Sequence, residues 1–254
     1  MIKKINFTFI YFFTLRLLKS KYRSSIFGIV LSNIFPLLTA TILSLIFSNI
    51  YKQSFQNFFP NISLAIIPWF FFLKTVNELS TSIIFNSQII KRKIQNLYNV
   101  SLCYLISNLF DTLINFIIFF IIIFIFKKND FYLDYFLIFV TIMTFVIFVY
   151  SIGICCAILN VYFNDFKHLL NFILQALFFL TPIIYQLKQI GAGFGKIIKL
   201  NPLTQFIVMF QKVIVKDKIF FISELNLIFS ITIAGLIISI LFTNFNKNKI
   251  QFYM

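Results

Sequence analysis

Long apolar runs, separated by short polar or basic stretches, dominate the chain. A bilayer core of about 30 Å needs about 20 apolar residues in a helix, at ~1.5 Å rise per residue. The pattern therefore predicts an all-α integral membrane protein with six transmembrane helices. The predicted spans are about 24–47, 62–84, 101–126, 135–159, 169–187 and 222–243.

The first 23 residues have an amphipathic pattern. Their basic and polar positions share one helical face, at Arg16, Lys19, Ser20 and Arg23. Phe9, Phe13 and Leu17 occupy another face. Arg16 interrupts the apolar stretch and no small-residue cleavage site follows it, so this is not the pattern of a signal peptide. The sequence predicts a helix over 1–23 that lies in the membrane interface.

Residues 188–221 do not fit a spanning helix. Gly191, Gly193 and Gly195 are expected to break any helix there. The apolar stretch 203–215 is too short to cross a bilayer, which favours a re-entrant or interfacial helix before the last span. All of residues 1–254 are predicted to form one transmembrane domain.

Composition supports a membrane protein and gives an orientation. Hydrophobic residues make up 60% of the chain and charged residues 11%, too few for a water-facing surface. The net charge of +15 does not indicate nucleic acid here, because the basic residues lie between apolar runs. The positive-inside rule places both termini in the cytoplasm. The lysines of 188–221 argue against this orientation, but early positive charge usually dominates.

Three charges lie inside predicted spans. Lys74 and Glu78 are four residues apart and can pair on one helix face. Asp111 shares a face of the next span with Asn108 and Asn115. Because charges in a bilayer are costly, one hypothesis is that Lys74, Glu78 and Asp111 form a buried cluster that holds helices together or moves during gating. The alternative is snorkelling or simple helix packing.

Several motifs, in order along the chain, resemble those of ABC-2 type permeases of the polysaccharide-export branch. They are L-K-S-K-Y-R-S-S-I-F-G at 18–28, F-P-L-L at 35–38, I-P-W-F-F at 67–71, N-V-Y-F-N-D-F at 160–166, F-F-L-T-P-I-I-Y at 178–185 and N-P-L-T at 201–204. No single motif is specific, but their order and spacing are. Asn164 stands where the family usually has Arg, which puts in doubt any pairing of that Arg with Asp165 or an ATPase.

The resemblance implies a homodimeric permease that exports a lipid-linked polysaccharide, such as O-antigen, capsule or teichoic acid, across the bacterial cytoplasmic membrane. It also implies two copies of a separate ATPase subunit, which carries the ATP and Mg²⁺. The residues it suggests for contact with that ATPase are Lys21, Arg23, Lys91, Arg92 and Asp165. The alternative is that these charges only set topology and touch headgroups.

A sugar chain in transit can stack on aromatic rings. The candidates for such a passage are Tyr22, Trp69, Phe178, Phe179 and Tyr185. The alternative is that they are ordinary membrane aromatics, which make up 20% of the chain.

Other chemistry finds little support in the sequence. The stretch 191–196 ends in Gly-Lys but lacks the remaining residues of a phosphate-binding loop. The three cysteines and His168 fit no metal site, and no nucleophile–base arrangement is present. We therefore expect no catalytic residues, metal or cofactor in this chain. The alternative functions are an ABC-2 permease for a drug or lipid and, less favoured, a membrane-embedded glycan transferase or an ion-coupled carrier.

Overall fold

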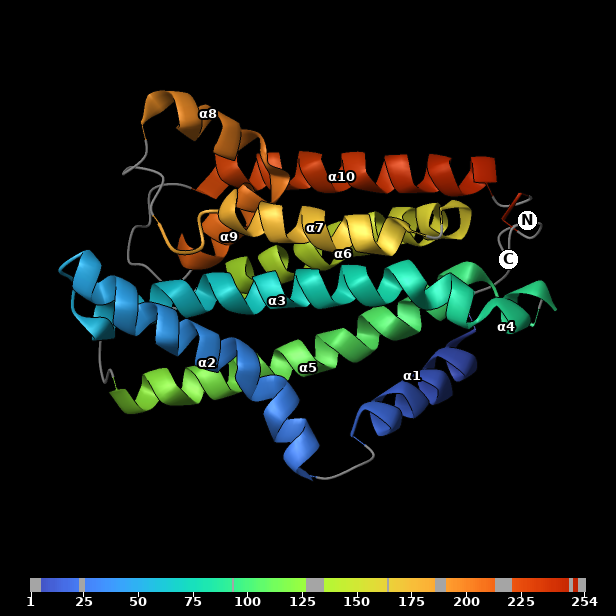
Figure 1. Cartoon of the computed structure of the whole chain (residues 1–254), viewed down its shortest axis with the longest axis horizontal. Coiled ribbons are helices and arrows are strands. Elements are labelled where there is room, and N and C mark those ends of the chain that lie inside the picture. Colours follow the sequence, from blue (N-terminus) through green and yellow to red (C-terminus); the bar gives the residue numbers. More distant parts are fainter. Residues whose placement is uncertain are drawn as a thin grey trace.

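The computed structural model describes residues 6–22, 26–92, 94–126, 135–163, 165–185, 191–212, 221–246 and 249–250. Within these residues the elements of regular structure are ten α-helices (Figure 1). Their bounds are α1 Phe7–Tyr22, α2 Ile26–Ile50, α3 Phe55–Phe85, α4 Ser87–Lys91, α5 Leu97–Phe126, α6 Tyr135–Tyr162, α7 Phe166–Phe179, α8 Ala192–Leu200, α9 Pro202–Lys212 and α10 Phe221–Asn246. The prediction of an all-helical chain is confirmed for the described part.

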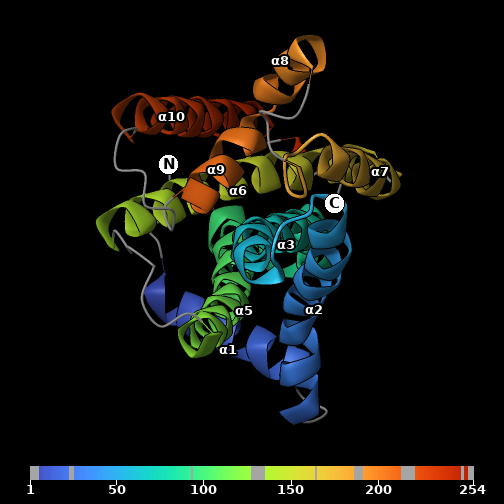
Figure 2. The same ribbon diagram turned by 90° about the vertical axis from the view of Figure 1, so that its left-hand side faces the viewer.

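Five of the helices contain segments long and apolar enough to cross a membrane: Asn33–Ile50, Phe55–Phe85, Leu97–Ile125, Phe136–Tyr162 and Glu224–Asn246. They run lengthwise through the molecule, and α3 lies at the centre (Figures 1 and 2). Within an 18-residue apolar stretch of the α3 segment 78% of residues are buried, against 17% in the corresponding stretch of the α10 segment. The chain is therefore a multi-pass membrane protein built around α3, with α10 on the outside.

The predicted fifth span, 169–187, differs from the structure. Helix α7 begins at Phe166 and ends at Phe179, and its 14 residues extend only about 21 Å. The following Thr181-Pro182 explains the end, because a proline disfavours helical backbone in the residue before it and cannot donate a hydrogen bond. The count of six spans stays a prediction.

Two connections are more helical than expected. Helix α3 starts at Phe55, before residue 62, where the second span was predicted to begin. The expectation that glycines break the helix at 191–195 is wrong, because Gly193 and Gly195 lie inside α8. Neither glycine has a positive φ, and a helical glycine costs only about 1 kcal/mol relative to alanine. Burial of Ile198, which is fully enclosed, offsets that cost.

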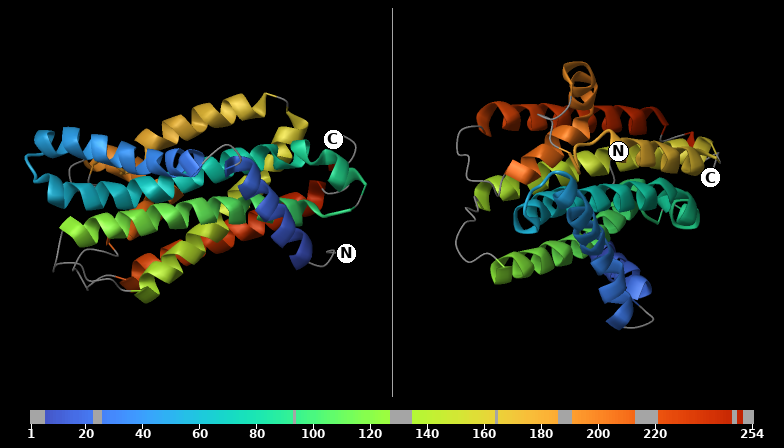
Figure 3. Two further views of the ribbon diagram at one scale, coloured as in Figure 1. Left: turned by 90° about the horizontal axis from the view of Figure 1, so that it is seen from below. Right: turned by 60° about the vertical axis from the view of Figure 1, so that its left-hand side comes forward.

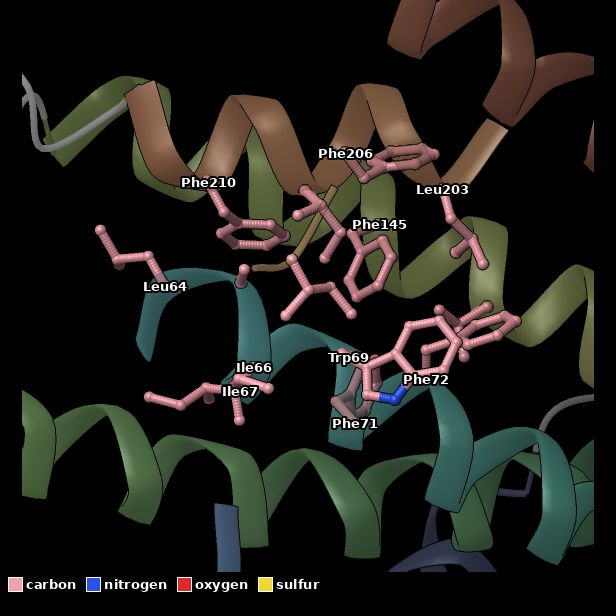
Figure 4. Packing of buried hydrophobic residues seen from close by; sticks show 14 of the residues in the cluster. Leu64, Ile66, Ile67, Trp69, Phe71, Phe72, Phe145, Leu203, Phe206 and Phe210 are labelled. Atoms are coloured by element: carbon pink, nitrogen blue, oxygen red, sulfur yellow. The ribbon is translucent and has the colours of Figure 1, made fainter. Parts of the chain in front are cut away.

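Helix α9 coincides with most of the apolar stretch 203–215, where we expected a re-entrant or interfacial helix. Figure 4 shows Leu203, Phe206 and Phe210 of α9 above Trp69 and its neighbours on α3. Phe206 stacks on Phe148 of α6 with ring centroids 4.9 Å apart. The helix is thus anchored to the core by aromatic packing, while its depth in the membrane stays a prediction.

Two of the motifs meet at the corner between α8 and α9. The Asn201 side chain donates to the Thr181 hydroxyl at 3.0 Å and accepts a hydrogen bond from the Leu203 backbone N–H at 3.1 Å. The Thr204 hydroxyl donates to the Ile198 carbonyl at 2.7 Å. The N-P-L-T and T-P-I-I-Y motifs therefore stabilise one turn, which satisfies backbone groups left open at the helix ends.

Candidate functional site

A polar cluster lies where the end of α1 meets the middle of α3 and α5. Helix α3 contributes Lys74 and Glu78, one helical turn apart, and α5 contributes Asn108 and Asp111 on one face. Helix α1 lies obliquely to the long helices (Figure 3) and contacts both α5 and α2. Its last two residues bring the remaining polar groups to the cluster.

Asp111 is the centre of the cluster. Its Oδ2 lies 2.6 Å from the Lys74 Nζ and 3.6 Å from the Lys21 Nζ. Its Oδ1 accepts a hydrogen bond from the Tyr22 hydroxyl. Only 5% of the Asp111 side chain is exposed. A carboxylate so deeply buried needs paired charges and hydrogen bonds, and this one receives both from α1 and α3.

Glu78 forms the second half of the cluster. Its Oε2 lies 3.2 Å from the Lys21 Nζ and accepts a hydrogen bond from the Asn108 amide at 3.0 Å. Lys21 also donates to the Asn108 Oδ1 at 2.7 Å. Two ammonium groups thus balance two carboxylates, so the cluster is formally neutral. This neutrality lowers the cost of placing four charges among apolar helices.

The structure brings together all three residues of the predicted intramembrane cluster, but with different pairings. Lys74 pairs with Asp111 across two helices, and Glu78 pairs with Lys21 rather than with Lys74 in the described part of the chain. Lys21 and Tyr22 were not predicted to belong to this cluster, because they lie on another helix. Whether the cluster moves during gating stays a prediction.

Tyr22 is the link between α1 and the buried carboxylate. Burial, together with its hydrogen bond to Asp111, raises the pKa of Tyr22 from 10.0 to about 12. The neutral phenol is therefore favoured, and it remains a donor to Asp111 over the physiological pH range.

A cavity of about 730 Å³ borders the cluster between α2, α3 and α5. Its polar wall consists of Asn33, Lys74, Asn77, Glu78, Asn108, Asp111, Thr112 and Asn115, and its apolar wall includes Phe35, Pro36 and Phe70. The carbonyl oxygens of the Asn77 and Asn115 side chains are buried and accept no hydrogen bond from the described residues. The cavity therefore has both a polar and an apolar wall.

Comparison with known proteins identifies the family. The family model described as "ABC-2 type transporter" matches residues 8–215. The chain belongs to the ABC-2 type transporter family. It is also similar to two proteins of Klebsiella pneumoniae, each named "O-antigen export system permease protein RfbA", with 28% and 26% identity over 238 residues. Each alignment covers 92% of this chain and 90% of the relative.

The residues suggested for ATPase contact in this ABC-2 transporter protein lie in three places. Lys91 and Arg92 are exposed, at the end of α4 and directly after it. Asp165 is exposed at the N-cap of α7, whose start lies at the same end of the bundle as α4 (Figure 1). Lys21 points instead into the polar cluster, and Arg23 lies outside the described residues. Contact of these residues with an ATPase stays a prediction.

The aromatic residues suggested for a sugar passage have different environments in the ABC-2 bundle. Trp69 is only 2% exposed, and Phe178 packs edge-on against it with ring centroids 5.5 Å apart. Both rings pack in the core of this structure, and the Trp69 ring has no exposed face that a sugar could contact. Phe179 is 72% exposed, and the Tyr185 hydroxyl donates to the Phe179 carbonyl at 2.8 Å. The Tyr22 hydroxyl donates a hydrogen bond to the Asp111 carboxylate.

Close helix contacts elsewhere explain two further sequence features. The Asn160 amide, in the N-V-Y-F-N-D-F motif, donates to the Ser80 carbonyl at 3.0 Å and so ties α6 to α3. Gly153 on α6 faces Leu79, and a Cβ there would lie 2.2 Å from the Leu79 Cδ1. Small residues allow membrane helices to approach closely, and this contact was not predicted from the sequence.

Proposed function

We propose that this chain is the membrane-spanning permease subunit of an ATP-driven exporter that moves a lipid-linked polysaccharide across the bacterial cytoplasmic membrane. The observation that carries the proposal is the similarity to two O-antigen export permeases over 92% of the chain. The family assignment and the five long apolar helices agree with a permease. O-antigen, capsule and teichoic acid all remain within the proposed substrate class.

The proposed assembly is a homodimer with two copies of a separate ATPase subunit that binds ATP and Mg²⁺. The described residues of one protomer pack closely around α3, and the cavity beside it holds about 730 Å³. A polymer that crosses the membrane needs a continuous passage, which supports formation of that passage between two protomers. We also propose six spans, with α7 and the residues after it forming the fifth, and both termini in the cytoplasm.

The polar cluster suggests how the ATPase drives the spans. In the proposed orientation, α1 and α4 lie at the cytoplasmic side, where an ATPase would bind. Lys21 and Tyr22 connect α1 to Glu78 of α3 and Asp111 of α5 through charged hydrogen bonds. A displacement of α1 would therefore be transmitted to α3 and α5, two of the three helices that border the cavity.

The proposal can be tested by co-purification. The permease is co-expressed with the ATPase of the same export system, and ATP hydrolysis is measured in proteoliposomes with and without lipid-linked polysaccharide. The expected result is a stable complex whose hydrolysis rises with the polysaccharide and vanishes without the ATPase. Hydrolysis by the permease alone, or stimulation by drug-like compounds or free lipids instead of the polysaccharide, would contradict the proposal.

A further inference from the structure

A second cavity, of about 420 Å³, lies between α1, the corner that joins α3 to α4, and α5. It is lined by Phe13, Arg16, Leu17, Ser20, Phe85, Asn86, Gln88, Ile89 and Tyr104. Asn86 forms the corner, after α3 ends at Phe85, and its side-chain amide donates to the Ser82 carbonyl and to the Tyr104 hydroxyl. One wall of this cavity is polar and the other is apolar.

The polar wall offers donors that have no acceptor. Arg16 and Gln88 are exposed, and within the described residues neither side chain is hydrogen-bonded or ion-paired. The Tyr104 hydroxyl accepts from Asn86 at 3.0 Å, which leaves its own hydrogen for another group. The Ser20 hydroxyl is already used by the Leu17 carbonyl at 2.8 Å. Guanidinium, amide and phenol thus present donors to one space.

No carboxylate in the described part of the chain balances Arg16. Glu78 and Asp111 pair with the lysines of the cluster, and Glu224 pairs with Lys212. Asp165 is exposed at the start of α7 and forms no salt bridge with Arg16. The charge of this cavity is therefore positive, and the complementary ligand is an anion.

The apolar wall suits acyl chains. Phe85 is 73% exposed beside Ile89, and Phe13 and Leu17 approach from α1. Further along α1, Phe7 is 77% exposed and Phe12 is 64% exposed, so this helix presents apolar side chains outward as an interfacial helix does. The ligand that fits this cavity is therefore an anion with a hydrocarbon part next to its charge.

We propose that this cavity binds one anionic phospholipid, with its phosphate against the Arg16 guanidinium and the Gln88 amide and its acyl chains along Phe85 and Phe13. Basic pockets between membrane helices on the cytoplasmic side hold such headgroups, and arginine binds phosphate through paired N–H donors. The lipid bridges α1 and the α3–α4 corner, so it stabilises the position of the helix that also carries Lys21 and Tyr22.

The test uses the full-length protein in detergent, titrated with phosphatidylglycerol or with phosphatidylcholine and examined by native mass spectrometry. One phosphatidylglycerol binds preferentially, and Arg16→Gln weakens that binding by about tenfold. Arg16→Lys keeps the charge but not the paired donors, so it weakens binding less. Lys199→Gln, which removes an exposed cation from α8, leaves binding unchanged.

Several results would overturn this assignment. Equal binding of the two lipids, or equal binding by the wild type and Arg16→Gln, removes the site. Full displacement by millimolar inorganic phosphate shows that a free anion occupies it instead. If Arg16→Gln abolishes binding of the ATPase while phosphatidylglycerol binding is unchanged, the cavity belongs to the protein partner. If Arg16→Gln unfolds, Gln88→Leu replaces it, and unchanged phosphatidylglycerol binding by that variant refutes the amide contact.

Discussion

Replacing Asp111 with Asn removes the one carboxylate that both lysines of the polar cluster approach. The Lys74 Nζ lies 2.6 Å from its Oδ2 and the Lys21 Nζ lies 3.6 Å from the same atom. Asparagine has nearly the same shape and can still accept from Tyr22, so the substitution changes charge and leaves packing intact. Lys21 then keeps its salt bridge to Glu78, whereas Lys74 loses its carboxylate partner among the described residues.

The magnitude follows from the burial of the pair. Breaking a fully buried ion pair costs about 3–5 kcal/mol, because one charge is left without compensation. The Lys74 side chain is 36% exposed and regains part of its hydration, so the expected loss of stability for Asp111→Asn is about 2–3 kcal/mol. In a double-mutant cycle with Lys74→Met, the coupling energy should be about 1–2 kcal/mol.

The assay is equilibrium unfolding in mixed micelles with increasing dodecyl sulfate, for the wild type, both single variants and the double variant. Glu224→Gln is the matched control. It breaks the Lys212–Glu224 pair, whose side chains are 41% and 27% exposed, and should cost less than about 1 kcal/mol. Additivity of the two cluster substitutions within ~0.5 kcal/mol, or an equal loss in the control, would refute the proposed pairing.

Three further outcomes are expected. Gly153→Ala should destabilise the protein by about 1–3 kcal/mol, because the new Cβ would lie 2.2 Å from the Leu79 Cδ1. Gly235→Ala is the control and should be neutral, because no atom lies closer than 3.6 Å to its new Cβ. Equal unfolding midpoints for the two variants would contradict the close approach of α6 to α3. Trp69 is the only tryptophan and is 2% exposed, so its fluorescence emission should be blue-shifted and not quenched by acrylamide. Red-shifted emission that acrylamide quenches would show that the indole ring is exposed to solvent. The pKa of Tyr22 is raised from 10.0 to about 12, so its contribution to stability is complete below pH 10 and is lost as pH rises through about 12. The difference between the absorbance titrations of the wild type and Tyr22→Phe should show a tyrosinate that forms near pH 12 rather than pH 10.

The long helices could be predicted because their signal is local. A run of apolar residues long enough to cross a bilayer has few alternatives to a helix, since no water is present to bond an exposed backbone. The end of α7 at Phe179 was missed, because Thr181-Pro182 stops a helix within a run that remains apolar. Helix α8 was not predicted, because its glycines favour a break in the helix. The burial of Ile198 outweighs the cost of these glycines.

The polar cluster could be predicted only in part. A charge inside a span needs a partner, so Lys74, Glu78 and Asp111 could be expected to meet. Their connection to Lys21 and Tyr22 depends on how α1 crosses α5, which is set by packing between residues far apart in the chain. The Gly153–Leu79 contact has the same origin, since one glycine in an apolar run does not reveal which helix it faces.

We propose that this chain forms the membrane passage of an ATP-driven polysaccharide exporter. The most direct measurement uses proteoliposomes that hold the permease and its ATPase with the ATPase outward, and follows protection of a labelled lipid-linked polysaccharide from an external glycosidase. If the chain forms this passage, protection requires ATP, Mg²⁺ and both subunits, and it decreases in Asp111→Asn. Protection without the ATPase, or none with the complete complex, would contradict it.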